Sequence, residues 1–262
     1  MVVGSIVVGV VALAWFIHRQ LHIEEPLLQL RALKTPTFAY SAVIVTVVNS
    51  ALAVGSVILP IYLQNVLGLT AFETGILMTP GAVATIFLSP VSGMLFDRFG
   101  PRVIAIMGLT GLTASLAALS LVDDKTMVAY LVAFYVIQSS GLTLANMPVT
   151  TWGINALPND MIAHGNAISN TGRQVGGAVS TALIVTVMTM VTAANAEAGP
   201  VLSTAAGIDV AYGISAAVAS VALVIAVLKV RNVKKQAVAS PASRAEAPLE
   251  IEMEEAREGA AR

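Results

Sequence analysis

Apolar residues gather in seven long stretches along this chain of 262 residues, and charged residues lie almost entirely between those stretches. A helix of about 20 apolar residues crosses roughly 30 Å of hydrocarbon, and it satisfies its own backbone hydrogen bonds inside lipid. Six stretches reach that length, and the first is slightly shorter. The pattern predicts seven transmembrane helices over Val2–Ile17, Phe38–Leu63, Thr74–Phe96, Val103–Val122, Met127–Val149, Val175–Ala194 and Val210–Leu228.

Most links between the predicted helices are short. The two exceptions are Thr150 to Gln174 and Asn195 to Asp209, which we expect to be longer polar loops. If the N-terminus lies outside the cell, the inner segments hold all but one of the 14 Lys and Arg residues, and the outer segments hold only Lys125. Cytoplasmic loops carry an excess of such cations. The distribution therefore predicts an outer N-terminus and a cytoplasmic C-terminus.

The composition supports a membrane protein, because 56% of the residues are hydrophobic and only 11% are charged, against about 25% charged in soluble domains. The chain has no cysteine, which excludes disulfides, thiolate metal sites and cysteine nucleophiles. The first stretch does not read as a signal peptide, because no cation precedes it while His18 and Arg19 follow it. It begins at Met1 without a leader, so we expect the chain to be part of a longer protein.

The segment GMLFDRFGPR, from Gly93 to Arg102, joins the third and fourth predicted helices. Gly100 suits a helix stop and Pro101 suits the first position of the next helix, so the link should be a tight hairpin. Asp97 is unfavourably placed, because a carboxylate near a helix C-terminus meets the negative end of the helix dipole. Arg98 and Arg102 are the nearest cations that could compensate it. An ordinary charged turn and a switch sensitive to conformation both fit these residues.

This segment resembles the loop motif of the major facilitator superfamily at five positions: Gly93, Asp97, Arg98, Gly100 and Arg102. LPIYLQNVLGLTAFETGILMTPGA, with Gln64, Gly68, Gly75, Pro80 and Gly81, is similar to the fourteen-helix drug:proton antiporter branch, the EmrB/QacA type. TGRQVGGA, which carries Arg173, Gln174, Gly176 and Gly177, resembles the same branch. The similarity is correctly ordered and spans almost the whole chain.

The resemblance implies an all-α, polytopic transmembrane helical bundle that forms the C-terminal half of such a transporter. Residues 1–37 would be a linker transmembrane helix with a cytoplasmic loop, residues 38–229 a six-helix bundle, and residues 230–262 a disordered cytoplasmic tail. The first half would be missing, together with the motifs thought to carry proton coupling. The expected partners are membrane lipid, a small-molecule substrate, protons and that N-terminal half, with no nucleic acid and no cofactor.

Polar side chains near the middle of the spans are the candidates for lining a cavity. No Asp, Glu, Lys, Arg or His falls near the middle of any predicted span, and Asp209 is placed at a helix end or in a loop. The neutral candidates are Asn49, Ser50, Gln138, Ser139 and Asn146. Each could instead form a hydrogen bond between helices. As a set they favour a cavity, and the family likeness places the helices over 38–63 and 127–149 beside the central pathway.

Arg173, Gln174, Gly176 and Gly177 stand at the inner start of the sixth predicted span and are candidates for a cytoplasmic gate. Small residues there permit close helix packing. Arg173 at a helix N-terminus would oppose the dipole and need an acidic partner or a lipid phosphate, and a simple interfacial anchor is the alternative. His18 and His22, with Glu24 nearby, fit interfacial loop histidines better than a metal site.

The sequence has no GxxxxGK phosphate loop and no GxSxG nucleophile elbow, so neither ATP hydrolysis nor serine-hydrolase chemistry is supported. We expect a transporter rather than an enzyme, with proton-coupled efflux of drugs or other small amphipathic molecules by alternating access. A membrane protein without transport activity, such as a truncated remnant or an assembly subunit, is the alternative. A seven-helix retinal protein is disfavoured, because its Schiff base needs a lysine inside the last helix and Lys229 lies at its end.

Overall fold

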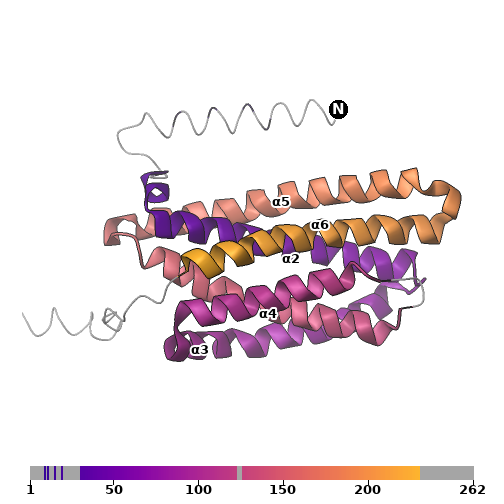
Figure 1. Ribbon diagram of the computed structural model, residues 1–262, viewed down its shortest axis with the longest axis horizontal. Helices are drawn as coiled ribbons and strands as arrows, with labels where there is room; N and C mark the ends of the chain where they lie inside the picture. The colour runs from indigo at the N-terminus through magenta and orange to yellow at the C-terminus, as the bar shows by residue number, and fades with distance from the viewer. Residues whose placement is uncertain are drawn as a thin grey trace, which may run out of the picture. The chain divides into compact units, whose positions relative to one another are not determined.

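The computed structural model describes residues 30–122 and 126–230, together with Gly9, Val11, Trp15 and Arg19. This part of the chain is helical and contains no strand. Its elements in chain order are η1 (Leu30–Lys34), α2 (Pro36–Asn65), α3 (Ala71–Leu119), α4 (Val128–Ile154), η2 (Asn159–Met161), α5 (Ile162–Ala194), η3 (Ala196–Ala198) and α6 (Pro200–Lys229), where η marks a 3₁₀ helix (Figure 1).

The five α-helices of the described residues are all long and apolar enough to cross a membrane. α3 contains two of the predicted spans. They are separated at Gly100, where the backbone leaves the helical conformation with φ at 79° and ψ at 169°. The structure thus confirms an all-α membrane bundle, and its helices contain the second to seventh predicted spans. The first predicted span, apart from Gly9, Val11 and Trp15, lies outside the described residues.

Two Gly-Pro pairs set the boundaries of helices in this bundle. Gly100 and Gly199 both have a positive φ, 79° and 92°, which a residue without a Cβ adopts at no steric cost. Pro101 and Pro200 follow them, and proline suits the first helical position because the N–H it lacks would have no partner there. The tight hairpin predicted at Gly100–Pro101 is confirmed.

The prediction of two long loops from the sequence is wrong. α4 continues to Ile154 and α5 already begins at Ile162, so the helix extends well before the apolar stretch. α6 likewise begins at Pro200. In its first turns α5 buries Gly165 and Ser169. Packing of that buried face stabilises a helix that hydrophobic length alone does not predict.

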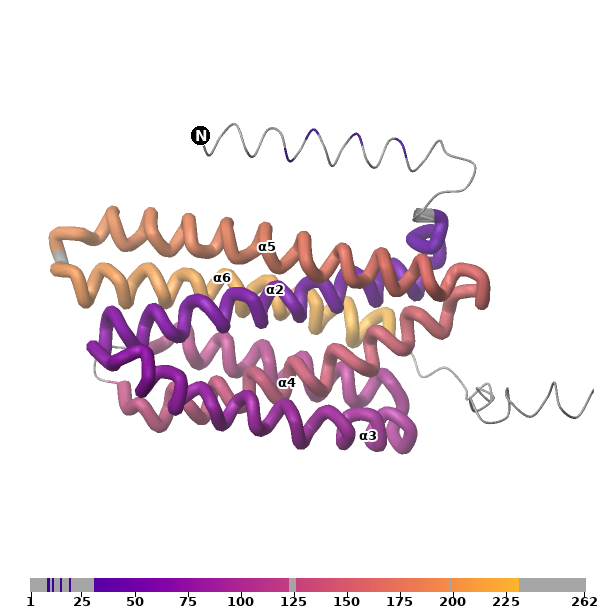
Figure 2. Tube along the Cα trace, turned by 180° about the vertical axis from the view of Figure 1, so that it is seen from behind, coloured from indigo at the N-terminus to yellow at the C-terminus, as the bar shows by residue number. Residues whose placement is uncertain are grey.

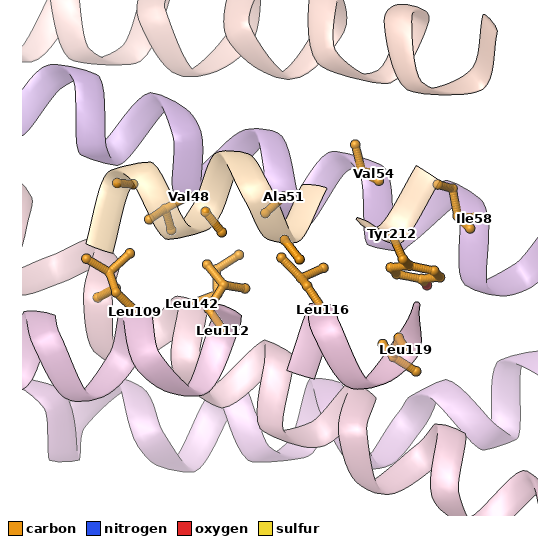
Figure 3. Packing of buried hydrophobic residues seen from close by; sticks show 14 of the residues in the cluster. Val48, Ala51, Val54, Ile58, Leu109, Leu112, Leu116, Leu119, Leu142 and Tyr212 are labelled. Carbon is orange, nitrogen blue, oxygen red and sulfur yellow. The ribbon is translucent and has the colours of Figure 1, made fainter. Parts of the chain in front are cut away.

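α2 and α6 lie at the centre of the bundle. α5 packs against α2 and α6, whereas α3 packs against α4 and α6, and both views place α5 and α3 on opposite sides (Figures 1 and 2). Apolar side chains from all five of these α-helices form the core. Its labelled members include Val48, Ala51, Val54, Ile58, Leu109, Leu112, Leu116, Leu119, Leu142 and Tyr212 (Figure 3).

Large apolar side chains also point outward from the bundle. Phe72 and Ile86 of α3 are 78% and 70% exposed, Leu183 of α5 is 61% exposed and Val221 of α6 is 60% exposed. Exposed large apolar side chains occur on every one of the five α-helices. Hydrocarbon solvates such side chains without cost, so the outer faces of the bundle fit a lipid environment.

Candidate functional site

A groove of about 1050 Å³ opens between α2 and α5. Pockets for small molecules span about 300–1,000 Å³ and combine apolar walls with a few polar groups. The polar residues that line the groove are Asn49, Ser56, Arg173, Gln174, Thr181 and Thr186. The small or apolar residues that line it are Leu52, Ala53, Gly177, Ala178, Ala182 and Val185. The groove thus has the size and the mixed lining of a site for an amphipathic molecule.

Glycines on α5 bring it close to α2 along one edge of this groove. A Cβ added to Gly172 would lie 3.0 Å from Thr46 Oγ1, and one added to Gly176 would overlap Thr46 Cγ2. A Cβ added to Gly177 would lie 3.6 Å from the Ala53 side chain, an ordinary contact. These contacts place residues 172–177 of α5 beside the middle of α2, which spans Pro36–Asn65.

Arg173 does not lie at a helix N-terminus, which corrects the expectation from the sequence. α5 begins at Ile162, so Arg173 lies about three turns into the helix. Its guanidinium donates to Asn170 Oδ1 at 2.8 Å and to Asn146 Oδ1 of α4 at 3.5 Å. Among the described residues its partners are therefore neutral amides, and neither the dipole argument nor an acidic partner applies.

The depth of Arg173 in the bundle also differs from expectation. Arg173 lies about 7 Å along the axis from the middle of α5, which spans Ile162–Ala194. Its partner Asn146 lies at a similar distance from the middle of α4, which spans Val128–Ile154. Sequence reasoning placed Arg173 at the start of its helix because it used the apolar stretch in place of the helix. The absence of ionisable residues near the middle of the spans stays a prediction.

The structure separates the predicted cavity residues into two groups. Asn49 lines the groove, and Asn146 holds Arg173 at its edge. In contrast, Ser50, Gln138 and Ser139 are 7%, 3% and 8% exposed and do not line it. Gln138 packs against α2, since a Cβ on Gly55 would lie 2.7 Å from its Nε2. α4 contributes no lining residue to the groove in the part of the chain described.

The residues of the loop motif lie at one end of the bundle, which we call the Gly100 end. Asp97 and Arg98 are exposed, and the Arg98 guanidinium lies 5.4 Å from the ring centre of Phe99. Arg102 donates to the carbonyl of Val227 at 3.2 Å, near the C-terminus of α6. Within the described residues Asp97 forms no ion pair or hydrogen bond, so neither expected arginine compensates it.

Gly93 and the gate candidates complete the predicted set. A Cβ on Gly93 would lie 3.6 Å from Met147 Cε of α4, which is an ordinary van der Waals contact, so the packing here does not require a glycine. Arg173, Gln174 and Gly177 line the groove, whereas Gly176 forms the contact with Thr46. The gate candidates thus lie at the groove between α2 and α5, and a gating role stays a prediction.

Sequence reasoning missed the groove hydroxyls and the position of Asp209. Ser56 and Thr186 donate to the carbonyls of Ala53 and Ala182 in their own helices, at 2.8 and 2.7 Å, which is why such residues are unobtrusive in apolar spans. Asp209 lies about two and a half turns inside α6 rather than in a loop. The Gly199-Pro200 pair was the signal that would have shown this helix start.

Metal binding finds no support in the described residues, where no cluster of three His, Cys, Asp or Glu side chains occurs. His18, His22 and Glu24, the residues weighed for a metal site, lie outside the described part of the chain.

Comparison with known proteins gives a consistent family match. The family model described as Major Facilitator Superfamily matches residues 1–181. The MFS-type transporter YcnB of Bacillus subtilis is 43% identical over 184 residues, which cover 70% of this chain and 39% of that protein. YhcA of the same organism is 39% identical over 188 residues, which cover 72% of this chain and 35% of YhcA. The lincomycin resistance protein LmrB of Listeria monocytogenes is 36% identical over 187 residues, covering 71% of this chain and 40% of LmrB. The chain thus spans between 35% and 40% of the length of these relatives.

Proposed function

This chain belongs to the major facilitator superfamily, and we propose that it forms the C-terminal part of a transporter that exports drugs or other small amphipathic molecules across the cytoplasmic membrane. The observation that carries this proposal is the groove between α2 and α5, which combines drug-sized volume with apolar walls and a few polar groups. A relative named for lincomycin resistance supports drugs as the substrate class.

One bundle supplies only one wall of a transport pathway. The groove is open on one side, and neighbouring residues of α5 such as Val175 and Val179 remain 42% and 52% exposed. We propose that an N-terminal bundle covers this face, with residues 38–229 as the C-terminal bundle, residues 1–37 as the linker helix and loop, and residues 230–262 as a cytoplasmic tail. The substrate would then lie between two bundles that rock against each other, as in alternating access.

The loop motif would bias which side of the pathway is open. Asp97 lies in the last turn of α3 before the break at Gly100. Its carboxylate there meets the negative end of the helix dipole without compensation from the described residues. A cation or helix N-terminus of the N-terminal bundle would supply that compensation in one state only. Arg102, held on Val227 at 3.2 Å, would keep the hairpin fixed to α6 while this contact forms and breaks.

The Gly100 end of the bundle would face the cytoplasm. Arg98 and Arg102 flank the hairpin there, and the Lys229 ammonium lies 5.3 Å from the ring centre of Tyr40 at the same end. The excess of cations on inner loops supports this orientation. The chain would then enter with its N-terminus outside and end in the cytoplasm.

Proton entry would drive export. In the described residues no carboxylate lines the groove, and Asp209 of α6 lies on the outer side of the middle of that helix. Proton relays in membranes use buried ionisable groups. We therefore assign the coupling groups to the N-terminal bundle, which makes both bundles necessary for antiport.

Reconstitution tests this proposal. The chain alone, in liposomes with an imposed proton gradient, should show no gradient-dependent movement of lincomycin or of a fluorescent amphipathic dye. Liposomes that also contain the N-terminal bundle should move at least one of these compounds, and a protonophore should abolish the movement. Gradient-driven transport by the chain alone would contradict the proposal, since these helices would then enclose a complete pathway.

A further inference from the structure

Arg173 presents a positive charge to the groove without an acidic partner in the described part of the chain. Its two hydrogen bonds go to the side-chain oxygens of Asn170 and Asn146, and the groove lining contains no carboxylate. The side chain is half-buried. A cation held in such a place by neutral partners lacks the counter-charge that ordinarily offsets its removal from water.

The neighbours of Arg173 fix its orientation and leave donors unused. A guanidinium has five N–H donors in a planar fork, and the hydrogen bonds to Asn146 and Asn170 use two of them. The Thr150 hydroxyl donates to the carbonyl of Asn146 at 2.8 Å and lies 3.4 Å from its Oδ1, which restrains that amide. A planar fork that is held in position matches a carboxylate, which accepts two parallel N–H bonds.

The rest of the groove suits the uncharged part of an amphipathic ligand. Leu52 and Val185 offer apolar contact, while Asn49, Gln174 and Thr181 add neutral polar groups. The lining contains neither an aromatic ring nor an acidic residue in the described part. A lipophilic cation would therefore find no ring face or counter-charge here, and it would meet the charge of Arg173.

We propose that this groove selects amphipathic anions, with the carboxylate of the ligand on Arg173 and its apolar part along Leu52 and Val185. The inference rests on the proposed function, since it names the substrate class of the same groove. It commits to a solute carboxylate rather than to a lipid phosphate, because the groove extends well beyond Arg173 and its volume of about 1050 Å³ fits a whole small molecule.

The absence of cysteine from the chain allows a direct measurement of charge preference in the groove. Ser56→Cys places a thiol in the lining, about 10 Å along α2 from Asn49. The purified chain in phosphatidylcholine nanodiscs is treated with an anionic sulfonatoethyl or a cationic trimethylammonioethyl methanethiosulfonate. Asn195→Cys, exposed at the far end of α5, corrects for the intrinsic reactivities of the two reagents.

After this correction the anionic reagent should react faster at position 56. Arg173→Gln should lower the anionic-to-cationic rate ratio by about tenfold. This is the effect expected of a single charge in the same groove as the thiol, where water screens it only in part. Arg173→Lys should largely preserve the ratio. Because Arg173→Gln could impair folding, Gln174→Glu provides a second test: it keeps Arg173, adds a carboxylate to the lining and should shift the ratio in the same direction. Equal ratios in all these variants would overturn the proposal.

Ligand protection then identifies the anion. Octanoate should slow labelling of Ser56→Cys at least fivefold more than octanamide or octylammonium does, and Arg173→Gln should remove that difference. Equal protection by octylammonium would overturn the proposal. Protection by phosphatidylglycerol in the nanodisc equal to that by octanoate would also overturn it, since the anion would then be a lipid headgroup. Labelling needs no transport, so this charge preference and the proposed transport function can fail separately.

Discussion

At the contact between Gly108 and Gly141, α3 and α4 approach so closely that a single added methyl group tests their packing. A Cβ on Gly108 would lie 2.6 Å from both the Ala145 nitrogen and the Gly141 oxygen. A Cβ on Gly141 would lie 2.6 Å from the Gly108 oxygen and 2.7 Å from the Leu112 nitrogen. Since all these neighbours are backbone atoms, no side chain can rotate away.

Ala at position 108 would therefore have to separate α3 from α4. Ordinary contact begins near 3.4 Å, so the helices would move apart by about 0.8 Å at this crossing (3.4 minus 2.6). Overpacking of this kind costs about 1–3 kcal/mol, and the gain of up to about 1 kcal/mol from replacing a helical glycine with alanine offsets part of it. We expect Gly108→Ala to lower the midpoint of thermal unfolding by roughly 2–8 °C.

Gly111→Ala is the matched control, because it lies one turn further along α3 and its Cβ would meet nothing closer than 3.9 Å. The same methyl group should be neutral or slightly stabilising there. The measurement is loss of the monodisperse gel-filtration peak of detergent-solubilised protein after heating across a temperature series. If Gly108→Ala is as stable as Gly111→Ala, the two helices do not cross as closely as the structure places them, and the reasoning fails.

Three further predictions concern orientation and the loop motif. Cysteines placed singly at Asp160 and Glu197 should differ in intact cells, Glu197→Cys reacting with an impermeant maleimide and Asp160→Cys only after lysis; the reverse pattern would invert the topology. In a transporter that contains this bundle, Asp97→Asn should reduce efflux at least fivefold at equal expression, whereas unchanged efflux would make Asp97 an ordinary turn residue. Arg102→Gln should lower the free energy of unfolding by about 0.5–1.5 kcal/mol, because it removes the charged donor to the Val227 carbonyl; no change in thermal stability relative to Arg98→Gln would exclude that contact as a stabilising one.

The sequence by itself determined the class of this protein and the local breaks in its chain. Hydrophobic length is a local property that follows from the thickness of a bilayer, so the second to seventh predicted spans match the helices of the structure. The hairpin at Gly100 and Pro101 also follows from local chemistry, since a positive φ and a missing N–H belong to those two residue types.

Tertiary structure alone decided where α5 begins and what its residues do. The segment before Val175 is too polar to show as a span, yet Gly172 and Gly176 pack on Thr46 and make it helical at the depth of the bundle centre. That packing brings Arg173 and Asn49 into the lining of one groove, although the two residues are distant in sequence. Helix partners are selected by the fit of facing surfaces, which no local pattern encodes, so the groove and its unneutralised charge become visible only in the folded chain.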